Sequence, residues 1–231
     1  MEMPVVVAFL SQKGGVGKST LARALADLAT KSGVKVLVAD LDRQQSTVMH
    51  WRQHRVTTKL QPPIDVVAFD SMDEAIEGGK DYDLIIVDAP GRAGAATLNI
   101  ARLSHLIVQP TGPGLDDLHP GVLLFHELFA EGIPVSRMTF ALCRTSAKEE
   151  EVAARRYLAK ADYSVLPGSI PERSEYRAAQ NTGRAITETN DASLNMRAEE
   201  LMVAMLERLK NEIEDLRRQI KRENEAGRES A

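Results

Sequence analysis

Short apolar runs bounded by turn residues recur along the chain and predict buried strands. Each run is rich in valine and isoleucine and apolar at consecutive positions, as in strands that helices cover on both faces of a sheet. The predicted strands span residues 5–10, 34–39, 64–69, 84–87, 106–108 and 138–142. Segments with helical spacing lie between or after them, at residues 19–32, 95–103, 115–129 and 149–161. This alternation predicts an α/β fold, a doubly wound, mostly parallel sheet with helices on both faces and right-handed crossovers.

The pattern changes from about Ala198 to the C-terminus. Apolar residues from Met202 to Ile220 recur at intervals of four and three, and the positions between them are mostly Glu, Lys and Arg. This spacing predicts one long amphipathic helix. We therefore expect a single domain over residues 1–209 and a charged helical extension over residues 210–231, which extends, pairs with a partner or frays.

Composition narrows the class of protein. The chain has 231 residues, of which 43% are hydrophobic and 27% charged, as in ordinary soluble globular proteins. No apolar run approaches the roughly 20 residues of a membrane span, and the first strand is too short and weakly flanked for a signal peptide. The net charge of −4 argues against a uniformly basic nucleic-acid-binding surface. The single cysteine, Cys143, excludes an intramolecular disulfide and favours a reducing cytoplasm.

Residues 13–20 read KGGVGKST, directly after the first predicted strand and before the first predicted helix. The glycines permit backbone conformations that side chains forbid, so consecutive amides can surround phosphate oxygens at a helix N-terminus. Lys18 is then expected to bind the β- and γ-phosphates, and the Ser19 hydroxyl to coordinate Mg²⁺. The order of elements favours this interpretation over a glycine-rich connecting turn. The predicted nucleotide-binding residues of the loop are Gly14, Gly15, Val16, Gly17, Lys18, Ser19 and Thr20.

The spacing of this loop departs from the common phosphate-loop pattern. Gln12 stands where that pattern has glycine, and a second lysine, Lys13, precedes the glycine pair. The string resembles the deviant Walker A sequence of the ParA/MinD family of ATPases, whose signature is the extra lysine. In that family the lysine reaches the ATP of the partner subunit. The resemblance implies ATP and Mg²⁺ as cofactors, a homodimer with ATP sandwiched at the interface, and catalytic roles for Lys13 and Lys18. The alternative for Lys13 is a solvated surface lysine.

The end of the second predicted strand carries two aspartates, Asp40 and Asp42, which share one side of an extended chain. Carboxylates there can hold magnesium waters or orient an attacking water. The segment resembles the family's Asp-x-Asp-Pro-Gln switch, which implies a catalytic, water-activating role for Asp42, a magnesium contact for Asp40 and a switch position for Gln44. Arg43 stands where the family usually has proline, which removes a rigid turn and adds a cation.

The fourth predicted strand leads into Asp88, in the sequence YDLIIVDAPG. Buried neighbours in such a Walker B pattern fix a carboxylate beside Mg²⁺, usually through a water. Taken alone, the aspartate is also consistent with a helix cap. Together with the other segments, it predicts a metal site formed by Ser19, Asp40 and Asp88. A second switch loop that senses the γ-phosphate is expected at Pro90, Gly91 and Arg92.

The similarity to the family extends from residue 5 to about residue 209 and is most specific in the first third. Residues 110–117 resemble the loop after the fifth strand, and residues 166–186 resemble the segment that closes over adenine in relatives. By this resemblance, Arg144 and Pro171 are expected near the base.

Other residues allow two interpretations. His50 and His54 have a metal-binding spacing, but a surface helix is favoured, with Trp51 used for packing. Basic residues between 144 and 184 fit a solvated helix face or, as in relatives, a surface that binds DNA non-specifically. These residues are Arg144, Lys148, Arg155, Arg156, Lys160, Arg173, Arg177 and Arg184.

The resemblance favours a positioning ATPase, which is cytoplasmic and nucleoid-associated in its ATP state. Its dimer would bind DNA, and a cargo-associated ParB-like partner or adaptor would stimulate slow hydrolysis; the cargo would be a plasmid, a chromosome or another intracellular body. The chain begins almost at the first strand, so specific operator binding is not expected. The alternative is a MinD-like membrane-cycling ATPase, although residues 210–231 hold six basic and six acidic residues, a poor match to anionic lipid. Enzymes that share this fold form a third class, of which one cysteine disfavours the cluster-bearing members.

Overall fold

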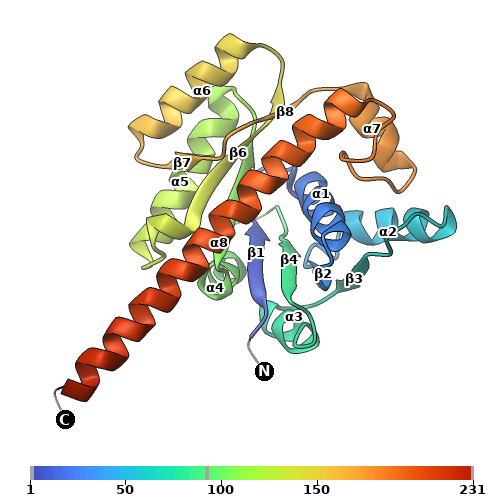
Figure 1. The fold of residues 1–231 in the computed structure, drawn as a ribbon. Coiled ribbons are helices and arrows are strands. Elements are labelled where there is room, and N and C mark those ends of the chain that lie inside the picture. Colours follow the sequence, from blue (N-terminus) through green and yellow to red (C-terminus); the bar gives the residue numbers. More distant parts are fainter. Residues whose placement is uncertain (1–2, 92–93, 230–231) are drawn as a thin grey trace.

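The computed structural model describes residues 3–91 and 94–229. Its described strands form one sheet in the order β3-β2-β4-β1-β5-β6-β7, with β8 beside β6, and each of their pairings is parallel (Figure 1). The strands are β1 (Val5–Phe9), β2 (Val36–Asp40), β3 (Asp65–Ala68), β4 (Leu84–Asp88), β5 (Leu106–Thr111), β6 (Met138–Thr145), β7 (Ser164–Val165) and β8 (Ile170–Pro171). The α/β fold with a parallel sheet is therefore confirmed.

Helices cover both faces of the sheet. The helices are α1 (Lys18–Lys31), α2 (Thr47–Thr57), α3 (Met72–Gly78), α4 (Ala95–Leu103), α5 (Leu115–Ala130), α6 (Lys148–Lys160), α7 (Ser174–Asn181) and α8 (Ala192–Glu229), with a short 3₁₀ helix at Val135–Arg137. Buried residues of α1, α2, α7 and α8 pack in one core, and those of α3 to α6 pack in the other. In β1, Val7 and Phe9 face the first core, whereas Val6 and Ala8 face the second. Strands buried on both faces explain why the apolar runs do not alternate.

The predicted helices and strands are all present, with ends shifted by a few residues. The strand ends matter most, because β2 runs on to Asp40 and β4 to Asp88, which the sequence placed just beyond the apolar runs. The short elements α3, α7, β7 and β8 were not predicted, since two to eight residues carry little periodicity. The long C-terminal helix begins at Ala192, earlier than predicted, because the Asp191 carboxylate accepts hydrogen bonds from the amides of Ser193 and Leu194.

The helix α8 crosses one face of the sheet and its C-terminal end extends beyond it (Figure 1). On its inner face Ala198, Leu201, Met202, Met205 and Leu209 are buried, whereas Ile220 is 48% exposed. We therefore propose the division into a domain over residues 1–209 and a charged extension over residues 210–231. Among the described helices, none has the length and apolar character that would let it cross a bilayer.

Candidate functional site

The loop between β1 and α1 has the backbone conformation that its glycines predicted. Gly15 and Gly17 have φ angles of 73° and 116°, in the left-handed region that side chains rarely adopt. A Cβ atom at Gly17 would also lie 3.3 Å from the Sγ atom of Cys143, so both conformation and space require glycine there. The Val16 side chain is buried, at 2% exposure. The loop thus brings its backbone to the carboxyl edge of the sheet, where ligands bind.

The helix α1 begins at Lys18, whose side chain lies near the phosphate loop and which is only 8% exposed. Its Nζ atom donates to the Lys13 carbonyl at 3.4 Å. Burial lowers the pKa of Lys18, and the charges of Asp88 and Asp42 oppose this shift. Within the described part of the chain, no side chain caps this N-terminus and its first turn has no acidic residue. Exposed amides, the helix dipole and an ammonium therefore favour an anion at this point.

Two buried carboxylates lie beside this N-terminus. Asp40 and Asp88 are register partners on the neighbouring strands β2 and β4, and they are 0% and 2% exposed. The pKa of Asp88 is raised to about 6: burial, the largest cause, and the charge of Asp40 raise it, while a hydrogen bond from Ser19 opposes the shift. Burial likewise raises the pKa of Asp40. Among the described residues, none donates a hydrogen bond to the Oδ1 atom of Asp88.

These groups fit a magnesium ion. Carboxylate and hydroxyl oxygens are the ligands that Mg²⁺ takes in proteins, together with water and phosphate oxygens. The unpartnered Asp88 oxygen could bind such a cation, directly or through water. The positive charge would also offset the cost of two buried negative charges. Ser19, Asp88 and Asp40 are the residues that would hold it, directly or through water.

Asp42 begins the segment that joins β2 to α2. Its backbone amide donates to Asp40 at 3.0 Å, and its own carboxylate accepts from the Gln45 amide at 3.2 Å. Ser46, in the left-handed region with φ 46°, closes the turn through a 2.8 Å bond to the Asp42 carbonyl. Arg43 forms an exposed ion pair with Asp70, the residue that follows the end of β3 by two positions. The segment is therefore held by hydrogen bonds within residues 40–46 and by the Arg43–Asp70 ion pair.

A cavity of about 360 Å³ opens where these elements meet. It is lined by Gly14, Gly15, Gly17, Lys18, Ser19, Thr20, Arg23, Asp42, Gln45, Thr47, Ala89, Arg177, Gln180 and Asn181. A second cavity of about 630 Å³ shares Gly14, Asp42 and Gln45 with it and reaches Gln44, Pro90 and Gly91. A Cβ atom at Gly91 would lie 3.6 Å from the Lys18 ammonium, so the second predicted switch loop passes next to the phosphate loop. Arg92, predicted in the same loop, lies outside the described residues.

Lys13 lies on the other side of the glycine pair from Lys18. Its side chain is 45% exposed, and its ammonium pairs with Asp117 and donates to the Asp116 carbonyl at 3.2 Å. The same Asp117 carboxylate also pairs with Arg144. In a single chain, Lys13 is therefore held by its own subunit, on the surface of the phosphate loop.

Arg144 and Pro171, the two residues predicted near a base, do not line the cavity of about 360 Å³ in the described structure. Arg144 is bound to Asp117, and Pro171 is buried in β8. The expectation that these two lie near a base stays a prediction. On the α7 side, the cavity is lined by Arg177, Gln180 and Asn181. Sequence reasoning missed these three because α7 was not predicted. It also missed Arg23, although this residue follows Ser19 by one helical turn, a spacing that could have indicated it.

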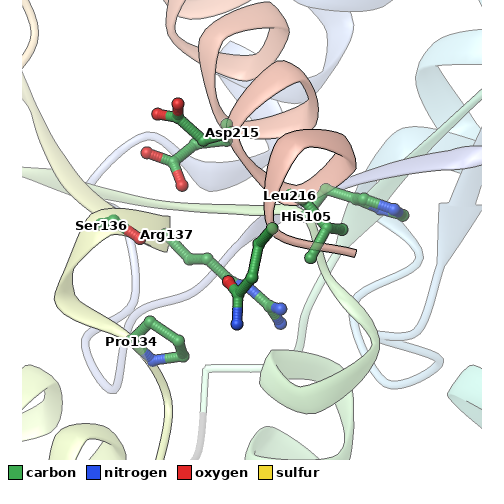
Figure 2. A pocket seen from close by; sticks show the side chains of 8 residues that line it. His105, Pro134, Ser136, Arg137, Asp215 and Leu216 are labelled. Atoms are coloured by element: carbon green, nitrogen blue, oxygen red, sulfur yellow. The ribbon is translucent and has the colours of Figure 1, made fainter. Parts of the chain in front are cut away.

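Two further features do not belong to this site. A cavity of about 130 Å³ lies under α8 at the amino edge of the sheet, where Arg137 and His105 lie opposite carboxylates of α8 (Figure 2). It is remote from the phosphate loop. On α2, His50 and His54 are exposed, whereas Trp51 is 2% exposed and packs in the core.

Comparisons with known proteins agree with this geometry. The model of the CobQ/CobB/MinD/ParA nucleotide-binding domain matches residues 7–227. The maintenance of carboxysome distribution protein A of Gloeobacter kilaueensis is 36% identical over 117 residues, which make up 50% of this chain and 52% of that protein. The chromosome-partitioning ATPase Soj of Thermus thermophilus is 29% identical over 133 residues, 45% of this chain and 53% of Soj. The matches thus span about half the length of these relatives.

The solved structure of the cell division ATPase MinD from Pyrococcus furiosus has the same fold. It matches with a TM-score of 0.71 at 18% identity and covers 89% of this chain and 99% of that one.

The raised pKa of Asp88 predicts how Asp88→Asn changes stability. Because the folded state holds the proton more tightly than the unfolded state, this carboxyl lowers stability as pH rises from about 4 to about 6. Asp88→Asn is therefore expected to increase the free energy of unfolding of the nucleotide-free protein near pH 7.5, by up to about 3 kcal/mol, and to change it little near pH 4. Urea unfolding at the two pH values measures this difference.

The exposed Asp81 provides the control, since Asp81→Asn is expected to change the free energy of unfolding by less than about 0.5 kcal/mol. A lower stability of Asp88→Asn near pH 7.5 would contradict the idea that the ionised carboxylate is a cost in the absence of a cation.

Proposed function

Because this chain belongs to the family of CobQ/CobB/MinD/ParA nucleotide-binding domains, we propose that it is an ATPase that dimerises around ATP and Mg²⁺ and positions a cargo. The observation that carries the proposal is a cavity lined by one buried ammonium and an uncapped helix N-terminus, with two buried carboxylates at the ends of the neighbouring strands β2 and β4. Each of these groups is costly in an empty protein and favourable beside a magnesium nucleotide.

The groups of this cavity have distinct roles in hydrolysis. The phosphate-loop amides, Lys18 and the Thr20 hydroxyl bind the phosphates, and Lys18 stabilises the charge that develops on the transferred phosphoryl group. Ser19, Asp88 and Asp40 hold Mg²⁺, which when bound neutralises phosphate charge. Asp42 lines the cavity and orients the attacking water. Gln180 and Asn181 of α7 line the same cavity, while Arg144 and Pro171 remain the residues expected near the base.

Lys13 is the residue that makes the site depend on a second subunit. It lies on the surface of the phosphate loop, half exposed, and pairs with Asp117 in an exchangeable contact. A triphosphate of a facing subunit offers this ammonium more negative charge than one carboxylate does. ATP then stabilises the homodimer, and hydrolysis weakens it, so that dimerisation depends on the presence of the γ-phosphate.

The dimer binds DNA non-specifically and meets a cargo-associated, ParB-like partner or adaptor that stimulates slow hydrolysis. The names of two relatives, which refer to chromosome partitioning and carboxysome distribution, support such a role. The protein is then cytoplasmic and nucleoid-associated in its ATP state.

The α6 surface is the candidate for DNA contact, and its residues are not equivalent. Arg155 pairs with Glu151 and donates to the carbonyls of Leu166 and Gly168 at 2.9 and 2.6 Å, so it stabilises the fold. Arg156 and Lys160 are exposed on the same helix. We therefore assign phosphate contacts to these two rather than to Arg155.

Replacement of Lys13 tests the dimer. Lys13→Ala is expected to stay monomeric with ATP, with dimerisation weakened at least about tenfold, because a charged interfacial contact is lost. Light scattering in ATP, in ADP and without nucleotide measures the molecular mass, and circular dichroism verifies folding. Lys80→Ala removes an exposed lysine at the amino edge of the sheet and should dimerise like the wild type. An ATP-dependent dimer of Lys13→Ala would refute the role of Lys13.

Electrophoretic shifts of an arbitrary duplex test the DNA surface, in ATP, in ADP and without nucleotide at fixed salt. The ATP state is expected to bind most tightly, and Arg156→Glu/Lys160→Glu to weaken it at least about tenfold through lost phosphate contacts. The control Lys80→Glu/Arg102→Glu reverses two exposed charges outside α6, one after α3 and one on α4. Equal shifts in all nucleotide states would contradict the DNA role, and ATP-dependent sedimentation with anionic liposomes would then favour membrane cycling.

A further inference from the structure

A row of polar side chains connects the nucleotide cavity to the body of the protein between α1 and α2. On each helix the residues are four positions apart, so they share one face. The row consists of Arg23, Asp27 and Lys31 on α1 and of Thr47, Trp51 and Arg55 on α2. Arg23, Asp27 and Arg55 are 6%, 0% and 2% exposed. Buried charges of this kind are costly unless each has partners, so the contacts of the row are specific.

Arg23 is the member of the row that lines the nucleotide cavity. Its Nη1 atom donates to the Gln180 side chain of α7 at 3.1 Å, and its Nη2 atom donates to the Thr47 carbonyl at 2.6 Å. Its guanidinium lies over the Trp51 ring, 5.6 Å from the centroid. The Nε atom is buried and has no hydrogen-bond acceptor among the described residues. One side chain therefore contacts the cavity, α7 and the first turn of α2.

The first turn of α2 is the end of the segment that carries Asp42. Thr47 directly follows residues 42–46, and Ser46 is bonded to the Asp42 carbonyl. Met49, in the same turn, donates its amide to Asp40 at 3.4 Å. A change in the position of Thr47 is therefore transmitted to both aspartates through short backbone connections.

Trp51 is firmly held on the side of the row remote from the cavity. Its Nε1 atom donates to the Arg184 carbonyl at 2.9 Å, and Arg55 lies over its ring at 5.5 Å. Arg55 in turn pairs with Asp27 and Glu188. Arg23 contacts both the Trp51 ring and the cavity, and Trp51 is the one tryptophan of the sequence.

We propose that Arg23 is a positioning residue that couples occupancy of the cavity to the first turn of α2 and thereby places Asp42 for hydrolysis. The proposal rests on the proposed nucleotide function. Gln180 accepts hydrogen bonds from both Thr20 and Arg23, so a nucleotide that orders Gln180 and the phosphate loop also fixes the guanidinium on Thr47. Without the guanidinium, the nucleotide still binds, but the Asp42 segment is no longer held relative to the phosphates.

Three variants separate this role from a merely structural one. Arg23→Met keeps the length and the apolar contact with Trp51 but removes the donors, and Arg23→Lys keeps one charged donor. Arg177→Met removes another arginine of the same cavity, one that pairs with Glu172. Each variant is studied as the full chain by calorimetry with ATP, by Trp51 emission on nucleotide addition, and by the kcat and KM of ATP hydrolysis.

The wild type is expected to change its Trp51 emission when ATP binds. Arg23→Met should bind ATP within about threefold of the wild type, lose most of the emission change and show a kcat reduced about five- to tenfold. Arg23→Lys should recover part of both signals. Arg177→Met should retain the emission change while its KM for ATP rises. If Arg23→Met fails to fold by circular dichroism, Arg23→Lys carries the same test of kcat against KM.

Two results would overturn the coupling. One is a wild-type Trp51 emission that does not change when nucleotide is added, and the other is an Arg23→Met variant whose emission change and kcat equal those of the wild type. Failure of the wild type to bind ATP in calorimetry is a different result, since it would overturn the proposed function itself and the coupling with it.

Discussion

The exclusion of three charged groups from water at one edge of the sheet dominates the chemistry of this protein. Lys18, Asp40 and Asp88 are all less than a tenth exposed. Burial favours the uncharged form of each, because it lowers the pKa of Lys18 and raises the pKa values of Asp40 and Asp88. The attraction between Lys18 and Asp88 does not satisfy these groups, because Asp40 and Asp88 repel each other and one Asp88 oxygen has no donor in the described structure. A cation and a phosphate chain would supply the missing partners. The arrangement is therefore more costly without a ligand than with one, which is the physical basis for treating it as a binding site.

The parallel sheet makes this arrangement possible. Each strand delivers its C-terminal residue to the same edge, so Asp40 of β2 and Asp88 of β4 meet as register partners, next to the loop that follows β1. Residues about 50 positions apart are thus brought together by strand register alone. The same geometry places the Asp42 segment and Gly91 around one cavity with Gly14 of the phosphate loop.

Much of this site could be predicted from the sequence, because its signals are local. The glycine spacing, the position of Lys18 at a helix start and the aspartates at strand ends depend on a few neighbouring residues. The remaining features depend on packing between distant segments. Gln180 contacts Thr20 across 160 positions, Asp117 holds Lys13 across 104, and Arg155 bonds to carbonyls that no periodicity reveals. The expectation for Arg144 and Pro171 rested on resemblance alone and stays a prediction, and the α7 residues that line the cavity were not foreseen.

Calorimetric titration of the wild-type chain with ATP, with Mg²⁺ and with a chelator in its place, tests the central claim most directly. If the buried carboxylates form the cation site, ATP is expected to bind at least about tenfold more tightly with Mg²⁺. Equal affinity under the two conditions, or no binding under either, would contradict the account.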